Sequence, residues 1–271
     1  MKKTVLITGT SSGIGQAAAV EFANQGWNVA ATMRTPEKDT TLKGKPGIKL
    51  YALDVTQPES IDAAMAAVVK DFGRIDVVVN NAGYGVDGAF EGFSDAVIHK
   101  QFDTNVFGLM RVTRAAVQLM REQGGGAIVQ ISSIGGRVTF PMFSIYHGTK
   151  WAVEGFTESL QYEVAPFNIR MKIVEPGPIK TEFYGTSRHF VMPEHTRAYD
   201  AMSKRAEKVA ADSTEKAELV EKVARTIFKA ATSTSRRMRY AVGRPGPLLV
   251  WLRKRIPDTW FFGLVRMIYK F

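Results

Sequence analysis

The sequence of 271 residues contains no cysteine and only four histidines. Without cysteine, the chain has no disulfide bonds, no thiolate nucleophile and no cysteine-ligated zinc. The four histidines are scattered along the chain, so we expect no metal site. Nothing in this composition points to an oxidising compartment.

Long apolar runs are also missing. No run approaches the roughly 18 residues that suggest a membrane-spanning helix. The N-terminal residues Met1 to Lys3 lead within one residue into a short strand-like stretch, without the apolar core and the small-residue cleavage site of a signal peptide. We therefore expect a cytoplasmic enzyme, and the length is ordinary for one α/β domain.

Acidic residues are scarce at the C-terminal end. The formal net charge is +10, and residues 236–271 carry nine basic residues against Asp258 alone, so that most of the excess lies in this segment. A nucleic-acid-binding protein would spread its positive charge over one face of the domain. We therefore expect no nucleic-acid partner.

The chain from 245 to 271 alternates apolar and aromatic residues with basic ones, as in Trp251 followed by Arg253 and Trp260 followed by Arg266. Such a segment can lie on an anionic membrane surface, cover a pocket or pack against a second subunit. We favour the last two roles. The predicted organisation is a catalytic domain over residues 1–243 and a basic, aromatic C-terminal extension over 244–271.

Short apolar runs alternate with helical patterns through most of the chain. This βαβ series predicts an α/β fold, a Rossmann-type doubly wound parallel sheet flanked by helices, with ligands at the carboxyl ends of the strands. Residues 182–212 show no further clear strand, and we predict a substrate lid there, with a surface helix pair as the alternative. The predicted strands are 4–8, 28–33, 48–53, 76–79, 127–131, 169–174 and 239–243, and the predicted helices are 60–72, 97–120, one from about 144, and 214–231.

Three glycines, Gly9, Gly13 and Gly15, lie between the first strand and the first helix. Glycines at this position let the backbone approach a pyrophosphate, whose charge is met by the amides of the helix N-terminus. The spacing is not that of the common dinucleotide fingerprint, and glycine-rich turns also occur for steric reasons alone.

Arg34 ends the second predicted strand, nineteen residues beyond Gly15. A carboxylate there would bind the adenosine ribose of NAD, whereas an arginine can pair with the 2′-phosphate of NADP. We therefore favour NADP(H), with a solvated arginine as the alternative. Asp54 and Val55 end the third strand and could approach the adenine, although an aspartate of a turn or helix cap fits the sequence almost equally well.

Two asparagines, Asn80 and Asn81, end the fourth predicted strand and precede Ala82 and Gly83. The small residues leave room for a cofactor, and an asparagine side chain can tie neighbouring backbone together. Asn105 lies inside a predicted helix, where an amide competes with the backbone for hydrogen bonds. We expect this amide to hold something.

Tyr146 and Lys150 are four residues apart at the start of a predicted helix, and Ser133 lies thirteen positions before the tyrosine. On one helix face, the ammonium would favour the phenolate and lower the tyrosine pKa towards working pH. The tyrosine would then donate and accept protons. A Tyr-x-x-x-Lys pair is common on helices, so its weight depends on the other motifs. Ser132 adjoins Ser133, and only the spacing to Tyr146 selects Ser133.

Taken in order, these motifs resemble the short-chain dehydrogenase/reductases in their single-domain form, over about residues 4–243. The resemblance rests on the Thr8–Gly15 turn, the segment from Asn80 to Gly83, Asn105, Ser133 with Tyr146 and Lys150, and Pro176-Gly177 followed by Thr181. It implies hydride transfer between a nicotinamide and a carbonyl or alcohol carbon.

The resemblance also implies roles for individual residues. Tyr146 would move the hydroxyl proton, Ser133 would bind the reacting oxygen, and Lys150 would lower the Tyr146 pKa and contact the nicotinamide ribose. Asn105 would hold a water linking Lys150 to solvent. The implied cofactor contacts are Gly9, Ser12, Gly13, Ile14, Gly15, Arg34, Asp54, Val55, Asn81, Ala82, Gly83, Tyr146, Lys150, Pro176, Gly177, Ile179 and Thr181.

Two positions depart from the commoner family pattern. Many NADP-using members carry a basic residue where this chain has Ser12, so the 2′-phosphate would depend mainly on Arg34. His147 follows the tyrosine, and we expect it to point away from Tyr146 and to serve packing. Use of NAD, and a dinucleotide-sensing protein without chemistry, are the alternatives that remain.

The substrate is the part least constrained by motifs. Residues 141–143 (Pro-Met-Phe) and the aromatic and methionine content of residues 182–202 suggest an apolar pocket. We therefore expect a lipophilic alcohol or ketone, steroid-like, retinoid-like or acyl. The family resemblance also suggests a homodimer or homotetramer formed through the helices that start near Val97 and Ser144.

Overall fold

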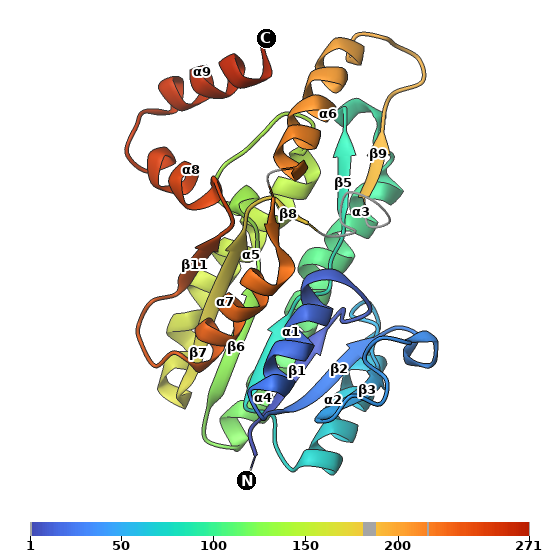
Figure 1. Ribbon diagram of the computed structural model, residues 1–271, viewed down its shortest axis with the longest axis vertical. Coiled ribbons are helices and arrows are strands. Elements are labelled where there is room, and N and C mark those ends of the chain that lie inside the picture. Colours follow the sequence, from blue (N-terminus) through green and yellow to red (C-terminus); the bar gives the residue numbers. More distant parts are fainter. Residues whose placement is uncertain (1, 181–187, 216, 271) are drawn as a thin grey trace.

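The computed structural model describes residues 2–180, 188–215 and 217–270, and its centre is a seven-stranded sheet with the order β11-β7-β6-β4-β1-β2-β3 (Figure 1). Every neighbouring pair in it is parallel. This confirms the expected fold class. The strands are β1 (Thr4–Thr8), β2 (Asn28–Met33), β3 (Ile48–Ala52), β4 (Val77–Asn80), β6 (Gly126–Ile131), β7 (Ile169–Pro176) and β11 (Arg239–Val242).

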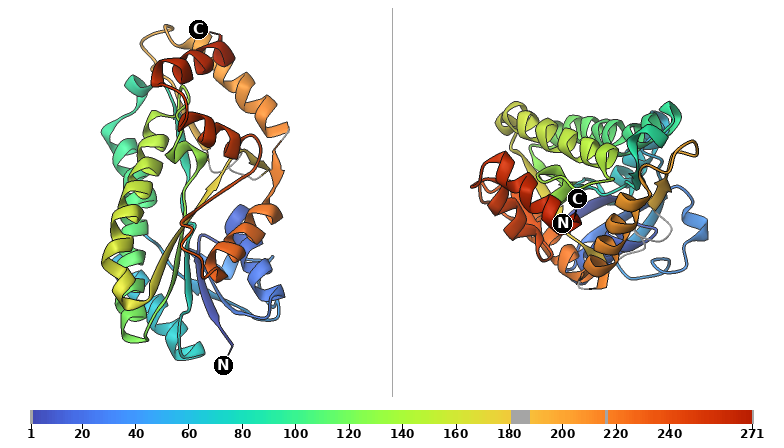
Figure 2. Two further views of the ribbon diagram at one scale, coloured as in Figure 1. Left: turned by 90° about the vertical axis from the view of Figure 1, so that its left-hand side faces the viewer. Right: turned by 90° about the horizontal axis from the view of Figure 1, so that it is seen from above.

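Helices cover both faces of the sheet, with α1 (Gly13–Asn24) and α7 (Val220–Thr232) on one face. On the other face lie α2 (Pro58–Phe72), α4 (Leu109–Glu122) and α5 (Ser144–Val164), as Figure 2 shows. Helix α2 ends where Gly73 takes a left-handed backbone with φ 81°, the stop that the sequence predicted. Short helical turns are η1 (Pro36–Lys38), η2 (Phe90–Gly92), η4 (Ile134–Gly136) and η5 (Ala165–Phe167).

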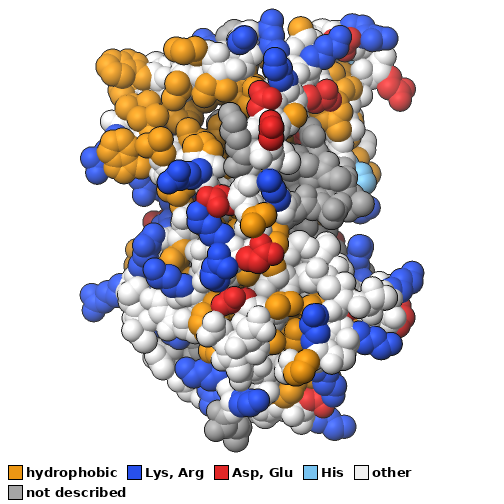
Figure 3. All heavy atoms as spheres, viewed as in Figure 1, with side chains coloured by type: hydrophobic (Ala, Val, Ile, Leu, Met, Phe, Trp, Pro, Cys, Tyr) orange, Lys and Arg blue, Asp and Glu red, His pale blue; other side chains and the backbone are white. Residues whose placement is uncertain are grey.

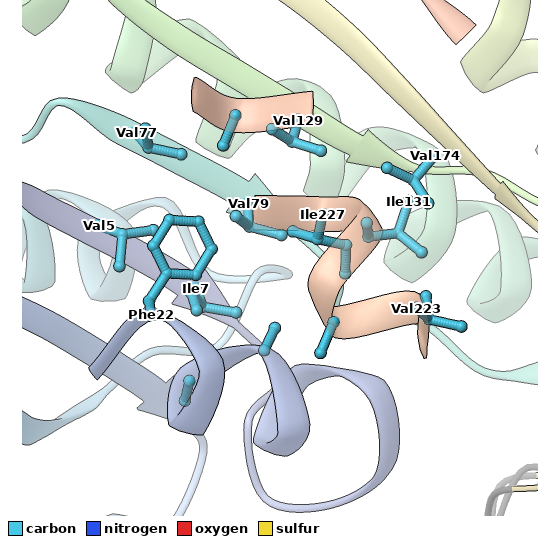
Figure 4. Close-up of a cluster of buried hydrophobic side chains, with 14 of the residues drawn as sticks. Val5, Ile7, Phe22, Val77, Val79, Val129, Ile131, Val174, Val223 and Ile227 are labelled. Atoms are coloured by element: carbon cyan, nitrogen blue, oxygen red, sulfur yellow. The ribbon is translucent and has the colours of Figure 1, made fainter. Parts of the chain in front are cut away.

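The core under α1 and α7 shows why the strands read as continuous apolar runs. Both faces of a covered parallel sheet are buried, and every residue of β1 is buried. Phe22 of α1 lies edge-on to Trp27 and to Phe228 of α7, with ring centroids 5.3 and 5.1 Å apart. Figure 4 shows Phe22 beside Val5 and Ile7, with Ile227 opposite Val79 and Val129.

The predicted long helix over residues 97–120 is interrupted at its Asn105 segment. The chain forms α3 (Asp95–Phe102), then a π-helical turn η3 (Asp103–Gly108), and then α4. A π-turn adds a residue to the helical path, which the hydrophobic period does not reveal. Gly108 in this turn lies against Val55, whose Cγ2 is 2.7 Å from the position of an added Cβ.

The segment after the last large βαβ unit holds more regular structure than the sequence predicted. Strand β9 (Arg188–Val191) pairs in parallel with β5 (Gly85–Gly88), and α6 (Asp200–Glu215) follows. The prediction of a region without a strand was therefore wrong over residues 188–191, because two four-residue strands that pair only with each other have no sequence period to detect. Residues 182–187 of the predicted lid lie outside the described residues.

The predicted helix over 214–231 begins later than expected. Residues 214 and 215 are the last turn of α6, and α7 begins at Val220, after the two-residue strand β10 (Glu218–Leu219) that pairs with β8 (Ile179–Lys180). The polar residues of this connection continue the helical pattern of α7, so the boundary was not visible in the sequence.

The C-terminal residues form two helices, α8 (Gly246–Arg253) and α9 (Asp258–Tyr269). They lie beyond the carboxyl ends of the sheet strands, beside α6 (Figure 1). Val250, Phe261 and Val265 are buried with Ala206 of α6 and with Val138 and Met142 in a third apolar cluster. Among the described helices, none is both long enough and apolar enough to cross a membrane.

Candidate active site

A cavity of about 830 Å³ opens at the carboxyl ends of the sheet strands, beside β1 and β4. The strand order reverses between these two strands, which is where open α/β sheets bind ligands. Most of the predicted site residues line it. They are Gly9, Ser12, Gly13, Ile14, Arg34, Asp54, Val55, Asn81, Ala82, Gly83, Ser133, Tyr146, Lys150, Pro176, Gly177 and Ile179.

Three predicted residues are not among the lining residues. Gly15 lies in the first turn of α1, Asn105 lies in the π-turn, and Thr181 falls outside the described residues. Gly15 and Asn105 instead lie behind the lining residues and contact them or their neighbours.

The glycine turn between β1 and α1 is built for close backbone contact. Gly9 has φ +69°, and a Cβ there would lie 2.8 Å from Cα of Ala82. A Cβ on Gly15 would lie only 2.3 Å from the carbonyl oxygen of Gly9. Ser12 precedes α1 without a side-chain cap bond, so the first amides of the helix face the cavity without a side-chain acceptor from Ser12. This cradle fits a pyrophosphate.

Asn81 ties the ends of β1 and β4 together. Its Nδ2 donates to the carbonyls of Thr8 and Gly9, each at 2.9 Å. The hydroxyl of Thr8 accepts from the amides of Asn81 and Ala82, each at 3.0 Å. The tying role of the asparagine was predicted, whereas the matching role of Thr8 was missed because a threonine ending a buried strand is ordinary.

Arg34 lies at the end of β2, exposed and on the cavity wall. Within the described part of the chain, it forms no ion pair with a carboxylate. Asp54 accepts from the amide and the hydroxyl of Thr56 at 2.9 and 2.8 Å, and its own amide donates to Ser60. This is the turn role that the sequence left open, and Asp54 also lines the cavity.

Ser133 and Ser132 differ in their surroundings. The Ser133 hydroxyl lies at the cavity, accepts from the Gly135 amide at 3.0 Å and donates to the Pro176 carbonyl at 3.4 Å. The Ser132 hydroxyl is buried and has no hydrogen-bond partner among the described residues. Both serines line the cavity, but only the Ser133 hydroxyl is hydrogen-bonded, and its selection by the spacing to Tyr146 stays a prediction.

Tyr146 and Lys150 lie one turn apart on α5, as predicted. Lys150 Nζ is 5.7 Å from the centroid of the Tyr146 ring and donates to the Ile131 carbonyl at 2.9 Å. Burial lowers the pKa of Lys150 to about 8, and the charge of Glu154 partly opposes this shift. The first turn of α5 and the end of β6 together place this ammonium.

Asn105 is buried behind the cavity with its amide engaged. Its Oδ1 accepts from the Tyr84 amide at 3.1 Å, and its Nδ2 donates to the Tyr84 carbonyl at 2.9 Å and to the Thr149 hydroxyl at 3.3 Å. We expected this amide to hold another group, and the group that it holds is the backbone of Tyr84. It thereby joins the π-turn to Tyr84, which lies between β4 and β5, and to Thr149 of α5.

His147 lines the same cavity with its ring beside that of Tyr146, whereas we expected it to point away from Tyr146 and to serve packing. Its Nδ1 accepts from the Phe140 amide at 3.4 Å, and its ring stacks on Phe143 at 5.6 Å between centroids. Burial lowers the pKa of His147 to about 4, so the ring is neutral at neutral pH. The tilted arrangement with Tyr146, 6.0 Å between centroids, keeps the two rings beside each other.

The outer part of the cavity is largely apolar and comes from segments far apart in the sequence. Phe140 and Phe143 precede α5, Val209 belongs to α6, and Leu249 and Ile268 belong to the C-terminal helices. The sequence suggested an apolar pocket, but it did not show that the C-terminal helices form part of its wall.

Comparison with known proteins agrees with this geometry. The family model described as short chain dehydrogenase matches residues 3–191. A solved short-chain dehydrogenase from Streptomyces avermitilis has 34% sequence identity and a TM-score of 0.81, with 98% of each chain covered. The solved structure of ElxO with NADP bound has 31% identity and a TM-score of 0.74, covering 89% of this chain and 97% of that one. Retinol dehydrogenase 8 of Homo sapiens is 41% identical over 192 residues, 68% of this chain and 61% of its own length.

Proposed function

This chain belongs to the short-chain dehydrogenase family, and we propose that it uses NADP(H) to interconvert a lipophilic ketone and the corresponding secondary alcohol. As a family member, it is an NAD(P)-dependent oxidoreductase. The observation that carries the finer proposal is that one cavity brings together the glycine turn, Arg34, the Ser133–Tyr146–Lys150 group and an apolar outer wall.

The cofactor-binding residues fit a dinucleotide by their own geometry. The tight contacts of Gly9 and Gly15 leave space only for backbone beside the turn, which lets a pyrophosphate approach the amides at the start of α1. Asp54 and Val55 would line the adenine end of the bound cofactor. The nicotinamide end would be lined by Asn81 to Gly83 with Pro176, Gly177 and Ile179. Thr181 is proposed as a further contact.

Arg34 supports NADP(H) over NAD(H). It is exposed at the cavity wall, has no carboxylate partner among the described residues, and a planar guanidinium matches a phosphate with two hydrogen bonds. The solved relative ElxO has NADP bound, which agrees with this choice.

The chemistry divides between the cofactor and three side chains. The bound nicotinamide supplies or accepts the hydride. Tyr146 donates the proton to the substrate oxygen during reduction and removes it during oxidation. The Ser133 hydroxyl donates a hydrogen bond to that oxygen, where negative charge develops. The Lys150 ammonium, which donates to the Ile131 carbonyl, would favour the phenolate form of Tyr146 and would bind the ribose next to the nicotinamide.

Asn105 acts by position. Its side-chain amide is engaged with Tyr84 and Thr149. The amide fixes the π-turn against α5, and a water that links Lys150 to solvent is proposed to bind beside it. This refines the role that the family resemblance suggested.

The outer wall supports a lipophilic substrate. Its phenylalanines, Val209, Leu249 and Ile268 offer apolar surface beyond the proton-transfer group. The similarity to a protein named retinol dehydrogenase 8 agrees with this class of substrate. Residues 182–212 act as the lid of the catalytic domain (1–243), and residues 244–271 form the extension that completes the wall.

We further propose a location and an assembly state for the protein. The protein acts in the cytoplasm and forms a homodimer or homotetramer through the surface around α4 and α5. Trp151 and Tyr162 of α5 and Phe107 of the adjoining turn η3 have between 47% and 73% of their area exposed, and a second subunit would cover this apolar surface.

The test of the cofactor proposal compares NADPH with NADH for wild type, Arg34→Ala and the matched control Lys38→Ala, an exposed cation outside the cavity. We expect wild type and the control to prefer NADPH. Arg34→Ala lowers the NADPH/NADH ratio of kcat/KM by about tenfold to a hundredfold, as loss of a charge-assisted hydrogen bond implies. A wild type that prefers NADH would overturn the proposal.

A further inference from the structure

The two C-terminal helices carry a concentration of exposed apolar side chains. Leu248 and Trp251 of α8 and Trp260 and Met267 of α9 each have more than half of their area exposed, although they are large hydrophobic residues. Figure 3 shows hydrophobic side chains gathered over α8 and α9 at the upper left of the molecule. Contiguous exposed apolar surface of this kind marks an interaction site.

The apolar arc of α9 is wider than its packing requires. Phe261, Val265 and Tyr269 form the buried stripe, which faces α6 and the third apolar cluster. Trp260, Leu264 and Met267 follow the same helical spacing on the neighbouring side, where they are exposed or half-buried. A helix packed only against its own protein would carry polar residues on that side.

Basic side chains border this apolar face. The guanidinium of Arg255 lies 5.2 Å from the ring centroid of Trp251, and that of Arg253 lies 5.5 Å from the ring of Phe262. Lys254, Arg266 and Lys270 add further positive charge, while the carboxylate of Asp258 is already paired with Arg253. Apolar aromatic residues bordered by cations are complementary to the interfacial layer of an anionic bilayer.

The same helices form part of the pocket wall. Leu249 lies one residue after the exposed Leu248, and Ile268 one residue after the exposed Met267, and both line the cavity. Ile268 is itself 45% exposed, so it belongs to the outer surface and to the cavity together. The apolar outer face is therefore continuous with the apolar interior of the pocket.

We propose that α8 and α9 dock on an anionic lipid bilayer, with Trp251, Trp260 and Met267 in its interfacial layer, and that the substrate enters the pocket from this bilayer past Leu249 and Ile268. The docking proposal depends only on the exposed residues of α8 and α9, whereas the entry route rests on the proposed function. A lipophilic substrate dissolved in the bilayer then reaches Tyr146 without crossing water.

Vesicle co-sedimentation of the full chain tests the docking. The probes are vesicles of phosphatidylcholine with phosphatidylserine and vesicles of phosphatidylcholine alone. The variant Trp251→Ser/Trp260→Ser/Met267→Ser removes the apolar face. The control Phe90→Ser/Phe167→Ser/Leu219→Ser removes exposed hydrophobic residues elsewhere. We expect wild type and the control to bind the anionic vesicles, and the α8–α9 variant to bind at least about tenfold more weakly.

A second variant tests the charge. Lys254→Gln/Arg266→Gln lowers the partition onto anionic vesicles by about tenfold or more, since each basic residue near such a surface contributes about a factor of five. The exposed pair Lys70→Gln/Arg121→Gln, on α2 and α4, leaves it unchanged. Raising the salt concentration weakens wild-type binding. Equal partition of the Trp251/Trp260/Met267 variant and its control would overturn the docking.

The entry route is tested with two ketones, one long-chain and embedded in the anionic vesicles, the other short and soluble in water. The Trp251/Trp260/Met267 variant loses rate on the embedded ketone and keeps its rate on the soluble one. Equal loss on both would overturn the entry route. If wild type reduces neither ketone, the proposed function fails while the vesicle binding still decides the docking. Self-association of wild type without vesicle binding would assign the face to a second copy and overturn the docking.

Discussion

Ser132 and Ser133 are adjacent in the sequence, yet the structure gives them different surroundings. Ser133 has its hydroxyl at the cavity, between the Gly135 amide and the Pro176 carbonyl. Ser132 has a buried hydroxyl without a partner among the described residues. The two residues therefore form a matched pair for separating a role in the reaction from a role in packing.

We expect Ser133→Ala to lower kcat by about a hundredfold, because one donor to the developing oxyanion is lost. Ser132→Ala leaves kcat within about twofold, since removal of an unpaired buried hydroxyl breaks no hydrogen bond. Steady-state kinetics with a reducible ketone measure both values. A larger loss of kcat in Ser132→Ala would show that the spacing to Tyr146 selected the wrong serine.

The buried Lys150 makes the free energy of unfolding depend on pH. Burial lowers its pKa from the ordinary 10.5 to about 8, so between these values the unfolded chain binds a proton that the folded chain does not. The free energy of unfolding therefore rises with pH across this window by up to about 1.4 kcal/mol per pH unit from this group alone. Below the lower value, this contribution is constant.

Urea unfolding of wild type and Lys150→Met across this window measures the effect. The slope of the unfolding free energy against pH is smaller in Lys150→Met, by up to the amount of one proton. Lys70→Met, an exposed lysine of α2, keeps the wild-type slope. Identical slopes for wild type and Lys150→Met would mean that the buried ammonium has an ordinary pKa.

At the scale of elements, the glycine turn depends on backbone contacts that only glycine permits. A Cβ on Gly15 would lie 2.3 Å from the Gly9 carbonyl oxygen and 2.4 Å from Asn81 Nδ2. Neither neighbour has room to retreat, because Asn81 is itself bonded to the carbonyls of Thr8 and Gly9. The turn, β1 and the end of β4 therefore form one rigid unit.

Gly15→Ala should lower the free energy of unfolding by about 1–3 kcal/mol, as other overpacked sites do, and should weaken binding of NADPH. Gly155→Ala is the control, since Gly155 is an exposed position of α5 with open space around it, and alanine in a helix gains about 0.5–1 kcal/mol over glycine. Chemical denaturation and fluorescence titration with NADPH measure the two effects. A Gly15→Ala variant with wild-type stability and wild-type affinity for NADPH would contradict the proposal that the glycine turn has no room for a side chain at this position.

The elements that the sequence predicted are those with a strong period and a clear end. Strands β1 and β2 have the predicted bounds, and α2 ends at Gly73 as expected. The π-turn around Asn105 and the pair β5 and β9 were not predicted. A single added residue in a helix and two short strands that stabilise each other leave no periodic signal, so only the folded chain reveals them.

At the scale of the whole molecule, the site is assembled from both ends of the chain. The glycine turn begins at residue 9, and Ile268 and Tyr269 close the outer wall. Spacing along the chain predicted the inner residues, because the ends of parallel strands meet at one edge. It did not place α8 and α9, whose packing against α6 depends on long-range contacts of Phe261 and Val265.

The positive charge of the molecule is concentrated at the C-terminal end of the chain. Most of the excess positive charge lies in residues 236–271, and the basic residues of α8 and α9 border their apolar face. The nearly neutral residues 1–235 and the basic C-terminal helices therefore differ in composition but share the pocket wall. Substrate access and chemistry can then be altered separately.

The most direct measurement follows consumption of NADPH by wild type and Tyr146→Phe with a lipophilic ketone, alongside NADPH binding by each protein. We expect wild type to turn over. Tyr146→Phe binds NADPH with similar affinity but is slower by about 10² to 10⁴, the usual contribution of a positioned proton donor. Equal turnover by the two proteins would contradict the assignment of Tyr146 as the group that moves the proton.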